Sequence, residues 1–565
     1  MVYNLADNII SPLGETTEQN FQALKAGHSV LRKYDGFRGV GEPYVASLIT
    51  EELIASLREN GLTIFESLVV SSVRRTIASA GLDVTKSNVV FILSSTKANI
   101  ELLEGHDFSE AEYPGVSAER IAKAIGVSNM PITVCNACIS GVSAIILAKR
   151  LLEAQLYDYA IVCGADRQTR FVISGFQSFK AVSTAECRPF DIERLGLNLG
   201  EAVATMILAR DNVANKESWG IACGAIRNDA YHISAPSKNG EGAYLALSAI
   251  CRNKDIRQLA FVNAHGTATM FNDQMESVAI ERAALNEIPV NGLKGYYGHT
   301  LGAAGILETI ISARACDEGI VLGTKGFDEL GVSGKIRLSN SHQACTGNSF
   351  IKMISGFGGG NAALWMTRTA EQNKGTDIPN LYVTHHVTLS PKQAVVDGRN
   401  IYIEGKGKQR IVDAYKRYVG DYPKFYKMDM LSRLGFVASE LLLAEEGNRS
   451  SEPSDERAVI LFNRSSSIHN DKLYLESIAG DEYFPSPSLF VYTLPNIVTG
   501  EIAIRNHYYG ETSFYVFSSR NDELMRQIVE VSVADDTMGS VLCGWLDFED
   551  DEQYIADLFI MQKPS

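Results

Sequence analysis

A short strand that breaks into a helix of small residues is the feature that most constrains this sequence. Residues 131–148 read Pro-Ile-Thr-Val-Cys-Asn-Ala-Cys-Ile-Ser-Gly-Val-Ser-Ala-Ile-Ile-Leu-Ala, a β-branched run followed by apolar residues at helical spacing. The pattern predicts that Cys138 lies at a strand-to-helix elbow, with its sulfur near the helix N-terminus. Unpaired backbone N–H groups and the helix dipole favour a thiolate at such a place. The stretch therefore predicts an activated cysteine nucleophile.

Two other interpretations of this stretch stay open. A cysteine is more often a small buried apolar residue than a nucleophile. Cys135 and Cys138 also form a C-x-x-C, which is typical of a redox pair or of half a zinc site. Zinc is disfavoured because no second C-x-x-C follows. The elbow alone supports a nucleophile, a redox pair and packing about equally, so residues further along the chain must decide.

The composition excludes several classes of protein. The 565 residues are 45% hydrophobic and 21% charged, which is enough for about two to four domains with ample cores. A formal charge of −15 argues against a nucleic-acid binder, because phosphate contacts need a basic surface. No run approaches the ~18 apolar residues of a membrane span. Nine scattered cysteines, and an N-terminus without a basic and apolar leader, predict reduced thiols and a cytoplasmic location.

Predicted strands alternate with predicted helices along the first part of the chain. Residues 2–12, 88–93 and 159–166 read as strands, whereas residues 62–80 carry apolar positions at helical spacing. This alternation predicts an α/β fold with a largely parallel, helix-covered sheet.

Two histidines follow predicted strands or turns of small residues. Residues 259–269 read as a strand and then a turn that carries His265, and the carboxyl ends of strands are where α/β folds collect catalytic groups. His299 lies in a second glycine-rich turn, ahead of a predicted helix that contains Glu308. One such histidine is usually a solvated or satisfied side chain. Two of them, together with a candidate nucleophile, predict one catalytic site.

Two further motifs lie in predicted loops. The glycine cluster at residues 355–361 precedes a strand and not a helix, so it does not fit a phosphate-binding loop. It is better interpreted as a tight turn that brings a backbone N–H into a site. Residues 187–191, Cys-Arg-Pro-Phe-Asp, are interpreted as an ion-paired structural corner in preference to a substrate contact.

Taken together, these motifs resemble the β-ketoacyl synthases of the thiolase superfamily, the condensing enzymes of fatty-acid and polyketide assembly. They run in family order from residue 2 to about residue 368: the Asn-Ala-Cys138 elbow, Cys187-Arg-Pro-Phe-Asp191, Gly200-Glu201, Ala264–Thr269, Lys294, Gly298-His299-Thr300, Gly302–Gly305 and Phe357–Asn361. The Cys–His–His combination resembles the elongating branch that uses an acyl carrier protein. The resemblance implies a thiolase-like fold with duplicated α/β/α/β/α layers.

The resemblance also implies a decarboxylative condensation. Cys138 takes an acyl chain from an acyl carrier protein as a thioester, and a malonyl thioester then loses CO₂ and attacks it. His265 and His299 stabilise the enolate, and the backbone N–H groups of Cys138 and Phe357 form an oxyanion hole. The substrates are carried on phosphopantetheine, and neither a metal nor a redox cofactor is expected.

Supporting residues are implied in the same way. Lys294, with Glu308 as its ion-pair partner, holds the two histidines in the right protonation state. Phe357 gates the acyl pocket, and Thr267 and Thr269 line the phosphopantetheine channel.

The rest of the chain is predicted to contain an incomplete second copy. Residues 369–379 are polar and read as a linker. Three later stretches parallel earlier strands, namely 381–391 with 2–12, 459–466 with the strand ending at Ser94-Ser95, and 541–545 with 161–165. The last offset puts Ser518 opposite Cys138, in a bulky elbow with no partnered base.

These parallels predict a domain plan. Residues 1–368 form the ketosynthase, with halves of about 1–205 and 206–368. Residues 380–565 form a half-thiolase α/β pseudo-domain that lacks the catalytic cysteine. It either packs on the synthase in place of a dimer partner, which is the favoured interpretation, or serves in chain-length control or carrier docking.

Three functions compete. The leading hypothesis is a 3-oxoacyl-[acyl-carrier-protein] synthase, an acyltransferase. The alternatives are a non-catalytic chain-length or partner subunit, against which Cys138, His265 and His299 argue, and a thiol–disulfide enzyme that uses Cys135 and Cys138. The expected partners are acyl and malonyl carrier proteins, and a homodimer through the elbow strand or a ketosynthase-type heterodimer. Nucleic acid and membranes are not expected partners.

Overall fold

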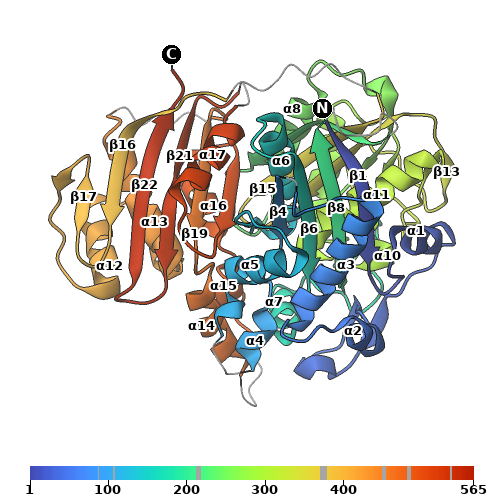
Figure 1. Cartoon of the computed structure of the whole chain (residues 1–565), viewed down its shortest axis with the longest axis horizontal. Helices are drawn as coiled ribbons and strands as arrows, with labels where there is room; N and C mark the ends of the chain where they lie inside the picture. The colour runs from blue at the N-terminus through green and yellow to red at the C-terminus, as the bar shows by residue number, and fades with distance from the viewer. Residues whose placement is uncertain are drawn as a thin grey trace.

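Two five-stranded sheets face each other in the N-terminal part of the chain, with helices between and outside them (Figure 1). They are joined at one edge, where Val2 and Tyr3 pair with Ile221 and Gly220. The computed structural model describes residues 1–86, 88–105, 109–210, 218–369, 378–447, 454–479, 485–534 and 537–564. None of the helices in these ranges combines the length and the apolar character needed to cross a membrane.

The two N-terminal sheets share one topology. The first sheet has the spatial order β1 (Val2–Ile10), β8 (Ala202–Arg210), β6 (Tyr159–Asp166), β4 (Val89–Ser94) and β5 (Ile132–Val134). The second has the order β9 (Gly220–Asn228), β15 (Gly360–Thr367), β14 (Ser349–Ser355), β10 (Leu259–Asn263) and β11 (Val290–Asn291). In each sheet the first two pairings are antiparallel and the last two are parallel.

The sheets are therefore mixed, and the predicted largely parallel sheet was wrong in this respect. A parallel pairing needs a long crossover connection, usually a helix. The connection between β14 and β15 is only a glycine turn at residues 356–359, so these two strands pair as an antiparallel hairpin.

Helices complete five layers. The central layer contains α6 (Ser140–Glu153) and α11 (Ala304–Asp317), and most residues of both are buried, as expected for helices enclosed on both sides. Helices α3 (Ile64–Ala80) and α5 (Pro114–Ile125) cover the outside of the first sheet. Helices α8 (Glu241–Cys251) and α9 (Met270–Arg282) cover the second. The predicted α/β/α/β/α layering is confirmed.

Shorter elements lie at the ends of these layers. They are α1 (Thr17–Lys25), α2 (Glu51–Leu57), α4 (Ile100–Glu104), α7 (Arg170–Ser178), α10 (Lys294–Tyr297), β2 (Arg32–Tyr34), β3 (Tyr44–Ser47), β7 (Leu199–Gly200), β12 (Ile320–Val321) and β13 (Gln343–Ala344).

The C-terminal part repeats the strand order of the first sheet. Its strands lie in the order β16 (Tyr382–Leu389), β22 (Tyr554–Gln562), β21 (Ser540–Phe548), β19 (Arg457–Asn463) and β20 (Thr512–Val516), again with two antiparallel and then two parallel pairings. The short strands β17 (Ala394–Val396) and β18 (Arg399–Asn400) extend its outer edge. Its helices are α12 (Gly407–Tyr418), α13 (Met430–Ala444), α14 (Ile468–Ile478), α15 (Pro487–Val491), α16 (Ile497–Asn506) and α17 (Asp522–Ser532). One sheet topology thus occurs three times in the chain.

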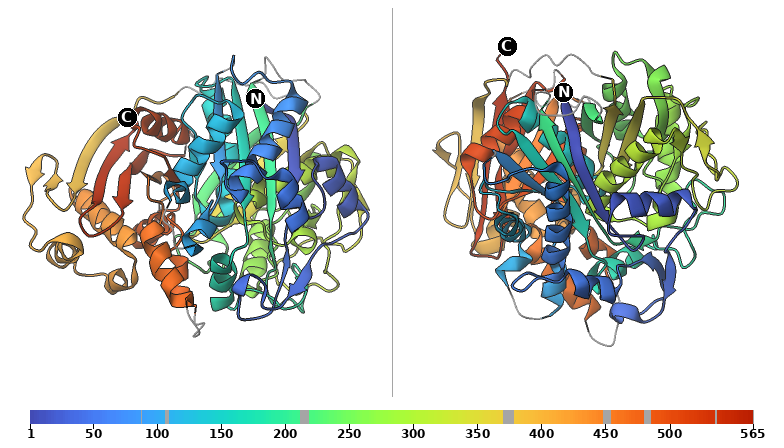
Figure 2. Two further views of the ribbon diagram at one scale, coloured as in Figure 1. Left: turned by 60° about the horizontal axis from the view of Figure 1, so that its bottom comes forward. Right: turned by 45° about the vertical axis from the view of Figure 1, so that its right-hand side comes forward.

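The C-terminal sheet continues the first sheet edge to edge (Figures 1 and 2). Strand β20 pairs antiparallel with β5, with Tyr515 opposite Val134. Next to this junction, Arg150 of α6 donates two hydrogen bonds to the Glu511 carboxylate, at 3.0 and 2.8 Å. The edge of β5, which would otherwise expose unpaired backbone groups, is covered within the chain. The contact that the resemblance assigns to two subunits is therefore made here by one chain.

Candidate active site

Cys138 lies in a tight turn between β5 and α6, as the sequence predicts. The turn is a short 3₁₀ helix, Ala137–Ile139, in which Ala137 adopts a positive φ of 48°. Before it, the Asn136 side chain accepts a hydrogen bond from the N–H of Phe514 at 2.6 Å, so the C-terminal sheet holds the elbow. Cys138 is buried, with 9% of its surface exposed.

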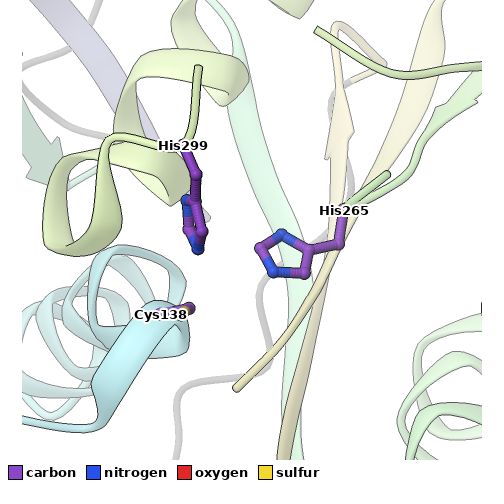
Figure 3. A group of neighbouring side chains, drawn as sticks. All are labelled: Cys138, His265 and His299. Carbon is purple, nitrogen blue, oxygen red and sulfur yellow. The ribbon is translucent and has the colours of Figure 1, made fainter. Parts of the chain in front are cut away.

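His265 and His299 converge on Cys138 (Figure 3). His265 follows β10, and His299 follows α10 at the start of the turn that leads into α11. The two rings meet edge to face with their centroids 4.9 Å apart. The Cys138 Sγ and one nitrogen of each ring all lie within 4.8 Å of one another. The three groups that the sequence placed on separate turns share one site.

The hydrogen bond to His299 defines its tautomer. The backbone N–H of Leu301 donates to Nδ1 of His299 at 3.3 Å, so this nitrogen is an acceptor and the ring proton belongs on Nε2. Within the described residues, Nε2 of His299 and Nδ1 of His265 are buried without a hydrogen-bond partner. A buried polar atom without a partner is costly, so these atoms are available to a ligand.

A buried carboxylate bridges two lysines behind the histidines. Glu308 of α11 forms ion pairs with Lys294 and with Lys352 of β14. Lys294 also donates to the carbonyl oxygen of His265 at 3.1 Å, and Lys352 donates to the Asn263 side chain at 2.8 Å. The predicted Lys294–Glu308 pair is present. Sequence reasoning missed Lys352, although a lysine inside the apolar strand Phe350-Ile351-Lys352-Met353-Ile354 was a usable signal.

This network keeps both rings neutral. Burial, together with the positive charge of Lys294 and Lys352, lowers the pKa of His265 and of His299 well below 6.5. Burial also lowers the pKa of Lys352 to about 8, against the attraction of Glu308. For Glu308, burial acts to raise the pKa, but the two lysines outweigh it and lower the pKa.

The protonation state of Cys138 differs from the thiolate that the sequence predicts. Burial raises the pKa of the Cys138 thiol to about 12, although the Lys294 ammonium acts to lower it. The resting group is therefore a thiol and not the predicted thiolate, because loss of water outweighs the nearby positive charge.

The same surroundings bear on metal binding and on the C-x-x-C. Thiol and imidazole are donors that zinc accepts, but two buried ammonium groups behind the rings oppose a dication there. Cys135 and Cys138 are both free thiols, and Cys135 packs into the core of the C-terminal part, away from the cluster that contains Cys138. The geometry does not support a redox pair or a metal centre.

Two carboxylates from α9 hold the turn that carries His265. The Glu276 side chain accepts hydrogen bonds from the N–H groups of His265 and Gly266, at 2.7 and 2.8 Å. Asp273 accepts one from the N–H of Ala268 at 3.1 Å. Both side chains are buried and point back to the loop. Their function in positioning His265 was missed.

A large cavity leads to the cluster from the surface. It has a volume of about 430 Å³, within the range of ligand pockets, and Cys138, His265 and His299 lie along its wall. Thr267 and Thr269 line it too, with their hydroxyl oxygens 2.9 Å apart. Their position agrees with the predicted channel lining.

Phe357 separates this cavity from a smaller one, and Cys138 lines both. The Phe357 ring stacks on Phe176 with centroids 6.0 Å apart, and its carbonyl oxygen accepts a hydrogen bond from Asn496 at 2.8 Å. A side chain on the preceding Gly356 would come within 3.1 Å of the Cys138 backbone nitrogen. A Cβ at this position would be in tight contact, so glycine favours the close approach of this loop to the N–H of Cys138.

The remaining sequence predictions fall outside the cluster. Arg188 forms ion pairs with Asp191 and Asp328, at 3.0 and 2.9 Å, which supports the structural corner. Ser518 is half-buried after β20, against Gly115 of α5, and does not line either cavity that Cys138 lines in the described part of the chain. The linker prediction at 369–379 falls largely outside the described residues.

Comparison with known proteins gives consistent matches. Residues 54–214 match the family Beta-ketoacyl synthase, N-terminal domain, and residues 220–328 match Beta-ketoacyl synthase, C-terminal domain. The chain is 28% identical over 406 residues to 3-oxoacyl-[acyl-carrier-protein] synthase 2 of Vibrio cholerae serotype O1, covering 64% of this chain and 97% of that protein.

Two solved structures show the same fold. A type II PKS acyl-carrier protein in complex with its ketosynthase bound to the hexaketide aligns with a TM-score of 0.58 and 20% identity, over 65% of this chain and 98% of that chain. The PfaC keto synthase-chain length factor structure aligns with a TM-score of 0.77 and 14% identity, over 100% of this chain and 78% of that chain. Residues 54–328, which carry the Cys–His–His cluster on the matched elements, belong to the beta-ketoacyl synthase family.

Proposed function

We propose that this protein is a 3-oxoacyl-[acyl-carrier-protein] synthase, an acyltransferase that joins an acyl thioester to a malonyl thioester with loss of CO₂. The observation that carries the proposal is the convergence of the Cys138 thiol with two neutral imidazoles at the base of a cavity. The name and the full-length match of the Vibrio cholerae relative support the same reaction.

In the first half-reaction Cys138 becomes acylated. Its sulfur forms a bond to the acyl carbonyl carbon, and the bond from that carbon to the phosphopantetheine sulfur breaks. The Cys138 proton leaves with the departing thiol. Because the thiol pKa is about 12, the proton must be taken up as the bond forms, and the neutral His265 ring, with a nitrogen within 4.8 Å of the sulfur, is the group placed to accept it.

In the second half-reaction the malonyl group loses CO₂. Its carboxylate carbon–carbon bond breaks, and the electron pair moves to the thioester oxygen as an enolate. The Nε2–H of His299 donates to that oxygen, and His265 lies beside it. The enolate carbon then attacks the acyl-Cys138 carbonyl, and the oxyanion is stabilised by the N–H groups of Cys138 and Phe357. Collapse of this intermediate releases the Cys138 sulfur as a thiolate, which takes up one proton from water and so balances the charge left by the lost carboxylate.

The ion pairs that Glu308 forms with Lys294 and Lys352 do not touch the substrate, but they affect the protonation of the two histidines. Burial, reinforced by the charges of Lys294 and Lys352, keeps the rings of His265 and His299 neutral, so His299 can hold a proton on Nε2 and donate it as a hydrogen bond. Glu308 makes two buried ammonium groups tolerable by neutralising part of their charge.

The partners and domains follow from the same proposal. The substrates arrive on acyl carrier proteins, as in the solved carrier–ketosynthase complex, and their phosphopantetheine arm passes Thr267 and Thr269. Residues 1–368 form the synthase, 369–379 a linker, and 380–565 a ketosynthase-like unit without catalytic residues. The pairing of β20 with β5 supports this last unit as an internal counterpart of a dimer partner. The reaction chemistry requires neither a metal nor a redox cofactor.

Acylation at a single cysteine tests the proposal. Wild-type protein incubated with an acyl carrier protein should gain one acyl group by intact mass, and Cys138→Ala should gain none. Cys135→Ala is the matched control, because Cys135 is equally buried three residues away and should leave loading unchanged. Loading that persists in Cys138→Ala, or no loading of wild type by any carrier-bound chain, would overturn the assignment.

The pH profile of malonyl decarboxylation provides a second prediction. Both imidazoles stay neutral from about pH 6 upward, because their pKa values lie well below 6.5, so the rate should be flat between about pH 6 and 7.5. Above about pH 8 the Lys352 ammonium loses its proton and the rate should fall. Lys352→Met should be slower and lack this alkaline limb. An inflection near pH 6.5 in wild type would contradict neutral histidines.

A further inference from the structure

A small apolar cavity lies behind Phe357, on the side of Cys138 away from the entrance. One wall comes from Val172 and Phe176 of α7, and the opposite wall comes from Phe490 and Leu494 of the C-terminal part. The cavity has a volume of only about 20 Å³. If Cys138 carries an acyl chain as proposed above, this apolar space is where the chain would enter, and the C-terminal part contributes three of its lining residues, Phe490, Thr493 and Leu494.

Lys97 is one of the residues that line this cavity. It lies in the turn after β4, where the Asp166 carboxylate accepts hydrogen bonds from the Ser95 hydroxyl at 2.8 Å and the Thr96 N–H at 3.0 Å. This turn directs the Lys97 side chain from the N-terminal part toward α14 of the C-terminal part. The side chain is only 6% exposed, which is unusual for a lysine.

The tip of Lys97 is fixed by three acceptors. Its ammonium pairs with Asp471 at 2.6 Å, donates to the Ser467 hydroxyl at 3.0 Å, and donates to the carbonyl oxygen of Thr493. The ammonium also lies 5.4 Å from the centre of the Phe171 ring. All three N–H donors are used, so the ammonium does not serve as a binding group for a ligand. What remains facing the cavity is the aliphatic stem.

A second cavity lies on the other side of Lys97. Its lining is mixed: apolar side chains come from α4 and α14, and polar ones come from the loops around them. The lining residues are Lys97, Ile100, Leu103, Glu112, Pro114, Ser465, Ser466, Ile468 and Asp471. These helices meet where the two parts of the chain lie against each other (Figure 1). Among the described residues, only Lys97 lines both small cavities. Its side chain is the partition between them.

We propose that Lys97 is the end wall of the acyl pocket, held in place by Asp471, and that it sets the longest acyl chain that Cys138 accepts. This inference rests on the proposed synthase function. A buried ion pair is seldom more stable than apolar packing, so stability alone does not explain it. A lysine tied at its tip by three acceptors cannot swing aside as an apolar side chain can. A fixed wall gives a sharper length limit than a mobile one.

Replacing Lys97 with a shorter side chain should let Cys138 accept a longer acyl chain. Lys97→Ala removes three methylenes and the ammonium, and joins the two cavities. Combining it with Asp471→Asn avoids an unpaired buried carboxylate, which would destabilise the protein. The matched control is Lys97→Met with Asp471→Asn, which removes the same charges and keeps a side chain of nearly the same length.

Acylation of Cys138 should be measured by intact mass with carrier-bound chains from acetyl to dodecanoyl. The Met/Asn control should accept chains of about the wild-type length with a less sharp limit, because its side chain fills the same space but is no longer fixed at its tip. The Ala/Asn variant should accept chains longer by about two to three methylenes, with a gain of at least about tenfold for the first chain that wild type excludes. Lys97→Leu with Asp471→Asn should give an intermediate limit, and it serves if the Ala/Asn variant does not fold.

The outcomes separate the two proposals. An unchanged limit in the Ala/Asn and Leu/Asn variants, while wild type loads normally, overturns the wall and leaves the synthase intact. A limit that moves equally in the Met/Asn control also overturns it, because the charge and not the side-chain length would then be the cause. Failure of wild type to load any chain removes the synthase function and the wall together.

Discussion

Replacing His299 with alanine is expected to abolish most condensation while leaving acylation of Cys138 intact. The Leu301 N–H occupies Nδ1, so His299 offers a donor at Nε2 and not a base. Its loss removes a hydrogen bond that strengthens as the enolate oxygen gains charge. Loss of one such preorganised donor lowers kcat by about 10²- to 10³-fold. The rate of CO₂ release from malonyl carrier protein and the intact mass of the acylated protein measure the two half-reactions separately.

Two variants make this prediction specific. His299→Asn keeps an N–H donor and should recover part of the decarboxylation rate. His342→Ala removes an exposed histidine outside the cluster and should change neither half-reaction. If His299→Ala lost acylation as well as decarboxylation, the ring would have to act as the base for the Cys138 thiol, and the tautomer derived from the Leu301 contact would be wrong.

Replacing Glu308 with leucine is expected to be the most destabilising single change in the site. It leaves the buried ammonium groups of Lys294 and Lys352 without their counter-ion, and breaking a buried pair in this way costs about 3–5 kcal/mol. The folded state can relieve the strain by releasing a proton from a lysine, whose unfolded pKa is about 10.4. That release costs less as the pH rises, so the loss of stability should be larger at about pH 6 than at about pH 9. Denaturant unfolding of the full chain at both pH values measures it.

A variant in which all three members of the buried ion-pair cluster are apolar separates the effect of the cluster on stability from its effect on the reaction rate. Lys294→Met, Glu308→Leu and Lys352→Met together leave no unpaired charge, and such replacements are often neutral in stability. The triple variant should therefore regain most of the stability that Glu308→Leu loses. Its decarboxylation rate should stay low, because the histidines no longer face two cations. Recovery of full activity by the triple variant would show that the ion pairs serve only to stabilise the fold.

Much of the site could be predicted from local patterns. Each of the three catalytic residues, Cys138, His265 and His299, lies in a run of small residues at a strand end or turn. Such runs can be recognised in the sequence, because the tight backbone geometry of a turn restricts which residue types fit. The five-layer fold was predictable for the same reason, once the motifs were recognised in family order. The relative direction of neighbouring strands was not predictable. Whether two strands run parallel depends on the length of the connection between them and not on the residue pattern within each strand.

The contacts that support the site were decided by tertiary structure alone. Lys352 pairs with Glu308 across 44 residues, and Lys97 pairs with Asp471 across 374 residues. The sequence by itself determined which residues carry the chemistry, since these are bound to local turn geometry. The resting thiol of Cys138, the tautomer of His299 and the wall at Lys97 depend on how much water is excluded and on which distant group supplies the partner. Burial and charge act through space and not along the chain, so only the folded protein decides them.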